Sequence, residues 1–431
     1  DTTVDEDNLY AYISYKKGMG YNLISLADTI RVQDKDDILL RKRTASYNAK
    51  GKMTQILQCN GSSVSNIDIQ YNSTYGNISR ITFPPNSTNQ RLYYDYTYDP
   101  VVHSYPVQVT SALGYKSTAT YDYRWGKPLV TKDINGNEIH YSYDLMGRTS
   151  TITAPYELAS GKPYTIKMEY NPVNFTKVDI FSFNTPDTFS FARTYHYNSQ
   201  NDTNDLRTTL LCDGFGRLLQ TKKDAEINGQ EVSIVSGKII YDAFGRTVTQ
   251  YHPFTEPLTQ DSIFNHYFDS GTETVTTYDI LDRQKEVTLP TVGITSFEYG
   301  FNGTQFLTRT FDANGNRTTV LKDGRGLQRE IMDADSNITS FEYNAMGELI
   351  ISTDPDGHST NYGYDMLGQK ISRVHPDAGL DRFQYDRAGN MISHQNKNLQ
   401  NNNNQWIEYE YNYNQLTHIN YPENPENNVI Y

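Results

Sequence analysis

The sequence predicts an all-β protein built from repeated antiparallel β-hairpins, and three observations support this fold class. Between 341 and 391 one phrase recurs, in which Tyr343, Tyr364 and Tyr385 are each followed four residues later by a glycine. These tyrosines are 21 residues apart, and such a fixed period is typical of stacked repeats. The chain also contains 36 tyrosines, which favour half-buried pleated surfaces. Gly, Pro, Asn, Ser and Thr interrupt the sequence throughout, as in a series of short strands and turns.

Charge and composition exclude several function classes. The 431-residue chain has a formal net charge of -13, whereas a nucleic-acid-binding domain needs clustered Lys and Arg. Cys59 and Cys212 are too far apart in the sequence to suggest a metal site or a disulfide framework. No apolar run approaches the ~18–20 residues of a membrane-spanning helix. Because the chain begins with Asp1 and ends in a strand-like pattern at 429–431, we expect a piece of a longer polypeptide.

Residues 1–46 are predicted to form an irregular β lead-in. The stretch 9–15 has alternating aromatic residues and fits a strand, whereas 22–27 fits either a strand or a helical turn. The repeat motif begins at Tyr47, and residues 47–431 are predicted to form one continuous repeat sheet. An irregular insertion interrupts this sheet at about 155–205.

The strongest copies of the motif read Tyr-Asp-x-x-Gly-Arg. Longer copies begin at Tyr71 and Tyr121, and a last, degraded copy begins at Tyr413. Cys212 stands in place of a tyrosine and Asp282 in place of a glycine, so we expect locally irregular hairpins there. The motif positions are Tyr47 and Gly51; Tyr143, Asp144, Gly147 and Arg148; Asp213, Gly216 and Arg217; Tyr241, Asp242, Gly245 and Arg246; Tyr278 and Asp279; Phe311, Asp312 and Gly315; Tyr343 and Gly347; Tyr364, Asp365 and Gly368; and Tyr385, Asp386 and Gly389.

Turn signals between the copies predict that one unit of about 20 residues is strand, turn, strand, turn. They read DINGN at 133–137, DANGN at 312–316, DGRG at 323–326 and DPDGH at 354–358. In such hairpins both central residues can take positive φ. The stretch 406–413 alternates apolar and polar residues, which predicts one apolar and one polar face. No helix of three turns is expected, and the Asn-rich tract 396–405 is predicted to be a loop.

Each residue of the motif has a structural role in this interpretation. The tyrosine ends a strand, the aspartate accepts hydrogen bonds from backbone amides of the turn, and the glycine supplies positive φ. The arginine then begins the return strand. Stacked units would place Tyr beside Tyr and Asp near Arg, and such cross-strand pairs contribute roughly 0.2–1 kcal/mol each. We therefore expect these residues to hold the sheet together rather than to contact a substrate.

The phrases YDAFGR, YDLMGR, YDMLG and YDRAGN resemble the YD repeats of the Rhs family, and the resemblance runs from about Tyr47 to Tyr413. The family includes bacterial polymorphic toxins, B and C components of Tc toxin complexes, and teneurins. The resemblance implies a long β-sheet that spirals into a hollow shell, or part of one. It also implies, as in bacterial members, that the shell encloses a toxic C-terminal cargo domain until delivery.

The same resemblance sets the expected partners and location. Family members often finish the shell with a segment rich in Asp-Pro and Gly-Leu that holds a self-cleaving protease site, and no such segment occurs here. We therefore expect a wall of the shell without plug, protease or cargo. The implied partners are the remaining parts of the same polypeptide or other toxin subunits, and the implied location is secreted or at the cell surface.

The sequence offers no site for catalysis, a cofactor or a metal, so we expect no enzyme. The nine His are scattered, and no zinc-protease, nucleophile-elbow or phosphate-loop motif occurs. The acidic turns at 133–137, 333–337 and 354–356 resemble calcium loops but lack the bidentate Glu. Two alternatives stay open: a cell-surface adhesion or carbohydrate-binding scaffold that uses Trp125 and Trp406, and a glycosidase, for which no carboxylate pair is identifiable.

Overall fold

The computed structural model confirms an all-β, repetitive antiparallel hairpin fold. Among the described residues, strands account for 59% and helices for 4%. Within the described parts of the chain, no helix is long and apolar enough to cross a membrane. The structure describes residues 10–17, 25–33, 36–60, 63–171, 190–198, 205–236, 239–258, 263–265, 272–412 and 414–431.

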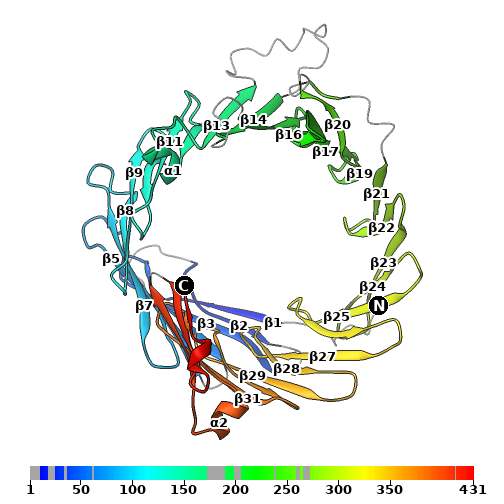
Figure 1. The fold of residues 1–431 in the computed structure, drawn as a ribbon. Helices are drawn as coiled ribbons and strands as arrows, with labels where there is room; N and C mark the ends of the chain where they lie inside the picture. The colour runs from blue at the N-terminus through cyan, green and yellow to red at the C-terminus, as the bar shows by residue number, and fades with distance from the viewer. Residues whose placement is uncertain are drawn as a thin grey trace. The chain divides into compact units, whose positions relative to one another are not determined.

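The strands form two sheets, in which neighbours along the chain pair antiparallel (Figure 1). The first sheet has 18 strands. They are β1 (Tyr10–Tyr15), β2 (Ala27–Gln33), β3 (Leu39–Tyr47), β4 (Met53–Asn60), β5 (Ser63–Tyr71), β6 (Ile78–Pro85), β7 (Arg91–Tyr98), β8 (Pro106–Ser111), β9 (Lys116–Asp122), β10 (Lys127–Lys132), β11 (Glu138–Tyr143), β12 (Thr149–Thr153), β13 (Ile166–Asn171), β14 (Ser190–His196), β15 (Leu206–Cys212), β16 (Leu218–Ile227), β17 (Gln230–Ser236) and β20 (Phe254–Pro257).

The second sheet has 17 strands. They are β18 (Ile239–Tyr241), β19 (Thr247–Tyr251), β21 (Glu273–Tyr278), β22 (Gln284–Leu289), β23 (Gly293–Phe301), β24 (Phe306–Phe311), β25 (Arg317–Lys322), β26 (Gln328–Met332), β27 (Ile338–Tyr343), β28 (Leu349–Thr353), β29 (Ser359–Tyr364), β30 (Lys370–His375), β31 (Gly379–Tyr385), β32 (Met391–Gln395), β33 (Ile407–Asn412), β34 (Gln415–Asn420) and β35 (Val429–Ile430).

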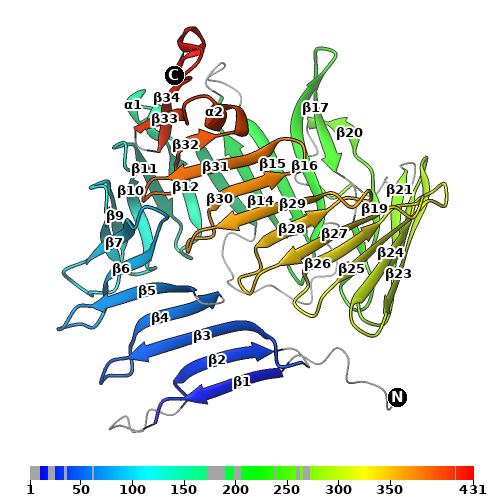
Figure 2. The same cartoon turned by 90° about the horizontal axis from the view of Figure 1, so that it is seen from below.

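By their contacts the strands fall into two compact units, each described by itself below. Unit 1 comprises residues 1–118, 299–309 and 317–431, and unit 2 comprises 119–298 and 310–316. In unit 1, β1 to β5 lie side by side (Figure 2).

The helices are short, and one of them corrects the sequence prediction. They are α1 (Pro155–Ala159), α2 (Lys397–Asn401) and the 3₁₀ helix η2 (Pro425–Asn427). The tract 396–405 was expected to be a loop, but α2 forms within it because Asn396 caps the helix. The Asn396 side chain accepts a hydrogen bond from the Leu399 amide at 2.9 Å, and Leu399 is buried.

Two predictions near the ends of the chain fall partly outside the described residues. The expected strand at 9–15 is present as β1, but half of the stretch 22–27, which fitted a strand or a helical turn, is not described, and Ala27 begins β2. Tyr413, the expected start of the last repeat, is not described either, and β33 ends at Asn412 before it.

Each sheet has little hydrophobic core. The buried hydrophobic residues in the described chain are Leu211, Val235, Phe264 and Leu399. The chain exposes 26506 Å² of surface, whereas a compact protein of 49.4 kDa exposes about 17,000 Å². In β33 the expected alternation is present, because Ile407, Tyr409 and Tyr411 are half-buried while the residues between them are exposed. Backbone pairing therefore carries much of the stabilisation that a packed core provides in compact proteins.

The turns at Asp144 and Asp133 are five-residue loops, whereas Asn228 and Gly229 form a two-residue turn between β16 and β17 with positive φ at both positions, 52° and 75°. In the turn that begins at Asp144, the amide of Gly147 donates to the Asp144 carbonyl at 3.0 Å, and the Asp144 amide donates to Arg148 O at 2.9 Å. The turn that begins at Asp133 has the same two bonds. There only Gly136 takes positive φ, at 87°, so the prediction of two central residues with positive φ is wrong for this turn. The Asp side chain fixes the first bend, which leaves one position for glycine.

A β-bulge precedes the turns at one end of the strands, and at the other end a register shift also precedes the turns after Gln33 and Pro85. In one set of turns, the strand register shifts just before the last residue ahead of the turn, wherever the pairing is recorded. We call these turns the tyrosine-end corners. The opposite-end turns that begin at Asp133, Asp333 and Asp354 have no such shift. The residues that follow the shift are Tyr47, Tyr71, Tyr98, Tyr143, Cys212, Tyr241, Tyr278, Lys322, Tyr343, Tyr364, Tyr385 and Tyr411.

The bulge reassigns two turns that the sequence placed differently. The DGRG turn at 323–326 is a tyrosine-end corner, with Lys322 in the tyrosine position. The turn of Phe311, Asp312 and Gly315 precedes β25, whereas the 323–326 corner follows β25, so the two lie at opposite ends of that strand. Sequence alone cannot separate the two ends, because both carry Asp-x-x-Gly and both recur every 21 residues.

Two glycines of unit 2 provide a matched test of corner packing. Gly147→Ala and Gly315→Ala each place an alanine at positive φ, 74° and 82°, which costs about 1–2 kcal/mol. At Gly147 a Cβ would also lie 2.6 Å from the Trp125 ring, whereas at Gly315 it would meet nothing within 4 Å. We expect Gly147→Ala to lower the free energy of unfolding by at least about 1 kcal/mol more than Gly315→Ala. Urea titration measures both, and equal losses would contradict the Trp125 contact.

Candidate functional site

Successive tyrosine-end corners are joined through the tyrosine hydroxyl. Tyr241 donates to Leu218 O at 2.8 Å, and Tyr278 donates to Thr247 O at 2.7 Å. In both cases the acceptor is the second residue after the glycine position of the preceding corner. Corresponding bonds join Tyr71 to Met53 O, Tyr143 to Pro128 O, Tyr170 to Thr149 O, Tyr385 to Lys370 O and Tyr411 to Met391 O.

The basic residue that follows the glycine makes a second contact between corners. The Arg217 guanidinium lies over the Tyr241 ring, with Cζ 4.6 Å from the ring centroid, and Arg246 lies over Tyr278 at 4.9 Å. Arg148 over Tyr170, at 4.5 Å, repeats the arrangement. A cation over a tyrosine face is attracted by the ring quadrupole. In these three pairs each corner thus holds the next one by a hydrogen bond and by a cation–π contact.

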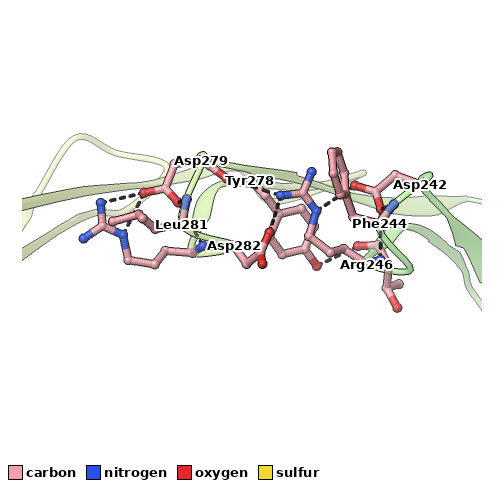
Figure 3. Close-up of polar contacts among 9 residues, drawn as sticks. Asp242, Phe244, Arg246, Tyr278, Asp279, Leu281 and Asp282 are labelled. Carbon is pink, nitrogen blue, oxygen red and sulfur yellow. Dashed lines mark hydrogen bonds and ion pairs between the residues drawn. The ribbon is translucent and has the colours of Figure 1, made fainter.

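The corner with Asp282 in place of glycine keeps this geometry (Figure 3). Asp282 takes positive φ, 62°, and its carboxylate accepts a hydrogen bond from Arg246 Nη1 at 2.8 Å. At the other altered copy, Cys212, the Asp213 amide still donates to Arg217 O at 2.9 Å. The expectation of irregular hairpins at both positions is therefore wrong, because the Asp side chain and not the variable residue shapes the corner.

The corner aspartates are stabilised as carboxylates. Asp213 accepts hydrogen bonds from the amides of Phe215 and Arg217, each at 2.9 Å, and from Arg217 Nε at 2.7 Å. Partial burial raises the pKa of Asp213, but these bonds outweigh it and hold the pKa below its usual value. Asp144, Asp242 and Asp279 show the same balance. These carboxylates are therefore committed to turn geometry and are poor candidates for general acid–base chemistry.

Asp99 forms a longer corner that the sequence motif missed. It is fully buried, and its carboxylate accepts hydrogen bonds from the amides of Val101, Val102, His103, Ser104 and Tyr105. Burial raises the pKa of Asp99, but the backbone bonds dominate and depress it strongly. The Tyr98-Asp99 pair was visible in the sequence, but Gly does not follow at the motif spacing.

One face of unit 2 carries a buried polar network across β14 to β20. Arg193 Nε donates to Thr209 Oγ1 at 3.0 Å. Lys222 is buried and forms an ion pair with buried Glu256. The buried polar residues of this face are Arg193, Thr209, Gln220, Lys222, Ser233 and Glu256. Cross-strand register pairs Arg193 with Thr209, Thr209 with Lys222, and Ser233 with Glu256, so their side chains share one face.

Residues 263–265, which we call the strap, cover this polar face. Phe264 is buried against Leu211. Asn265 exchanges hydrogen bonds with Gln220, since its amide donates to Gln220 Oε1 at 2.9 Å and its carbonyl accepts from Gln220 Nε2 at 3.3 Å. The Asn265 side chain also donates to Glu256 Oε2 at 2.5 Å. The strap thus joins the ion pair and the apolar cluster in one buried unit, which no sequence motif signalled.

An acidic cavity of about 540 Å³ opens beside this network. Asp224 in its lining accepts from Arg207 Nε at 3.0 Å, and Asp205 accepts from the Tyr164 hydroxyl at 2.6 Å. The hydrogen bond to Asp205 raises the pKa of Tyr164 to about 12. Asp205, Arg207, Asp224, Glu226 and Glu231 are the charged lining residues. Because carboxylates outnumber the one arginine, the cavity disfavours anions.

Other residues singled out by the sequence occupy structural positions. Asp354, Asp356 and His358 bring potential ligand atoms within 4.8 Å of one another, but all three are exposed and Asp354 bonds within its own turn. Trp125, a residue of the carbohydrate-binding alternative, packs over Gly147. The motif residues lie at successive corners and are not gathered into one pocket.

Removing one partner of the buried ion pair tests the polar network. Glu256→Gln would leave the Lys222 ammonium buried without its carboxylate, which costs about 3–5 kcal/mol of stability. We expect this loss in urea unfolding of unit 2, followed by tryptophan fluorescence. The double variant Lys222→Met/Glu256→Leu serves as the control and recovers most of the loss, because no charge remains buried. A neutral single variant would contradict the assigned pair.

The Asp99 corner predicts a distinctive pH dependence in unit 1. A carboxyl with a depressed folded-state pKa stabilises the fold above its unfolded-state pKa, about 3.9, and this contribution declines as the pH falls below that value. We expect Asp99→Asn to be less stable than the natural chain at pH 7. The difference should narrow between pH 4 and pH 3, measured as urea midpoints. A difference that stays constant over this interval would contradict the depressed pKa.

Comparisons with known proteins support the fold and the family. Residues 323–358 match the RHS repeat family, and residues 187–298 match DUF6443, a domain of unknown function. The second match covers the polar network and the strap. No curated protein matches the chain.

Solved structures extend the similarity across the chain. A crystal structure of TcdB2-TccC3 fused to TEV matches at 14% identity and a TM-score of 0.66, covering 98% of this chain and 30% of the other. TcdB2-TccC3 without its hypervariable C-terminal region matches at 15% identity and a TM-score of 0.67, covering 98% and 29%. The Tc holotoxin pore of Photorhabdus luminescens, with a variant TccC3, matches at 14% identity and a TM-score of 0.65, covering 96% and 29%.

The present chain therefore spans under one third of the length of these chains. The RHS-repeat match, the recurring tyrosine-end corners and the fold agree with one another. Residues 323–358 are an RHS repeat, and the chain as a whole is similar to Rhs/YD-repeat proteins in motif and fold.

Proposed function

We propose that this chain is a wall segment of a toxin-related Rhs shell, which encloses a toxic C-terminal cargo domain until delivery. The observation that supports this most directly is the bonding between successive corners. Tyr241, Tyr278 and their counterparts join each hairpin to the one before it. A sheet held by neighbour-to-neighbour bonds can be extended without a packed core, which suits a wall that separates two compartments.

The proposed function is physical and involves no catalysis in this segment. The corner aspartates are held as carboxylates by their own turns, buried Lys222 is paired with buried Glu256, and half-buried Arg207 is paired with Asp224. Such groups support the wall rather than proton transfer. The polar strap region, which coincides with the DUF6443 match, would reinforce the sheet locally.

The proposed partners are the other parts of the same polypeptide or other toxin subunits, and the proposed location is extracellular. TcdB2 and TccC3 occur together in the matched structures, and another of these carries Cdc42 in the same complex. Those assemblies concern the relatives themselves. For this chain they support an association with components of the same kind.

Protease protection in the full-length polypeptide tests the proposal. We expect its C-terminal domain to resist a protease concentration that digests the same domain expressed alone. Tyr241→Phe/Tyr278→Phe removes two bonds between corners and should increase cleavage of the C-terminal domain. Tyr156→Phe, at an exposed tyrosine, is the matched control. Mass spectrometry of the fragments provides the measurement. Equal digestion of the enclosed and isolated domains would overturn the proposal.

A further inference from the structure

Five tyrosine-end corners of unit 2 present large apolar side chains to solvent. Leu145, Phe215, Phe244 and Ile280 are 88%, 87%, 81% and 97% exposed. They lie between the aspartate and the glycine position of their corners, where the corner geometry does not require an apolar residue. We call these residues, together with Tyr123, Trp125, Met146 and Leu281, the apolar rim.

The corresponding positions of three later corners, in unit 1, are covered. Met346, Leu367 and Ala388 occupy the position before the corner glycine, and none of them is exposed. Two contacts show what lies against this row. Gln58 Nε2 lies 2.9 Å from Met346 Sδ, and Asn86 Nδ2 donates to Tyr385 O at 3.0 Å.

Both contacting residues lie away from the tyrosine ends of their own strands. Asn86 begins the opposite-end turn between β6 and β7, and Gln58 lies two residues before the end of β4. Unit 1 therefore contains an interface in which tyrosine-end corners meet the opposite end of another part of the sheet. Neighbouring turns at one end of the sheet are two strands apart, which is about 9.6 Å. A row of tyrosine-end corners and a row of opposite-end turns therefore have the same spacing between turns.

The same chain also displays an uncovered row of opposite-end turns. The turns at 333–337, 354–358 and 376–378 are exposed. They carry Asp335, Asp356 and Asp377, whereas the corners of the apolar rim carry Arg124, Arg148, Arg217, Arg246 and Arg283. Each of these arginines forms an ion pair with the aspartate of its own corner, so the two rows match in spacing but not in net charge.

The apolar rim is large enough for a stable interface. Its eight side chains are between 40% and 97% exposed, and large side chains carry roughly 150–250 Å² each. The rim therefore offers on the order of 1,000 Å², compared with about 800 Å² per partner in an interface of standard size.

We propose that the apolar rim of one copy binds the opposite-end turns at 333–337, 354–358 and 376–378 of a second copy. Each bound copy would then still present one free surface, either its apolar rim or its opposite-end turns. The contact is therefore heterologous, that is, head to tail. Association would repeat, between chains, the contact that Gln58 and Asn86 make with later corners within one chain. This inference does not depend on the proposed cargo.

Sedimentation velocity of the full chain tests the proposal. We expect association that rises with concentration in the micromolar range. Phe215→Ser/Phe244→Ser should weaken it at least tenfold, because the two most exposed aromatic rings of the rim are lost. Val292→Ser is the matched control, since Val292 is 65% exposed but lies in the turn between β22 and β23, at the opposite end. Circular dichroism checks that each variant folds.

A mixing experiment tests the head-to-tail geometry. Asp335→Lys/Asp356→Lys should also abolish self-association, because it replaces two exposed side chains of the proposed contact surface. When mixed, the rim variant and the turn variant should form a one-to-one pair and no longer assembly, because each supplies the surface that the other lacks. A natural chain that stays monomeric, a Val292→Ser variant as weak as the rim variant, or variants that fail to pair would each overturn the proposal.

Discussion

The bond from a tyrosine hydroxyl to a carbonyl of the preceding corner is the interaction on which this structure depends most. In a compact domain the hydrophobic core fixes the position of each element, but here few apolar residues are fully buried. The hydroxyl of Tyr241 or Tyr278 replaces this long-range constraint with a local one. The stacked arginine then shields the ring, so the same residue serves two neighbouring corners. This explains the abundance of tyrosine better than propensity alone does.

The sequence was sufficient for the fold class and for the structural roles of the motif residues, because the 21-residue period and the Tyr-Asp-x-x-Gly phrase are local signals. It was insufficient where the same local pattern occurs in turns at both ends of the strands. The turns at Asp312 and Asp323 look alike, yet they lie at opposite ends of β25, and the second follows a bulge. Asp99 was missed because its longer loop satisfies the carboxylate without glycine.

The polar network of unit 2 escaped the sequence for a different reason. Charged residues at alternate positions of β16, such as Lys222 and Asp224, normally indicate a solvated face. Here the strap covers part of that face, and each charge meets an opposite one across the strands. Burial of this kind depends on a segment more than 30 residues away in the chain, as the separation of Lys222 from Glu256 shows. No periodicity within one strand can reveal it.

Because many corners are joined to their neighbours by the tyrosine bond, resistance to mechanical force should be distributed along the sheet. Pulling at an edge strand would load one pair of corners at a time, as in opening a zipper, rather than the whole fold together. Each step would break a similar set of bonds, so the extension should proceed at nearly constant force. A material with this response yields gradually and withstands damage to one hairpin. The tyrosine hydroxyl thus confers toughness, a property distinct from thermodynamic stability.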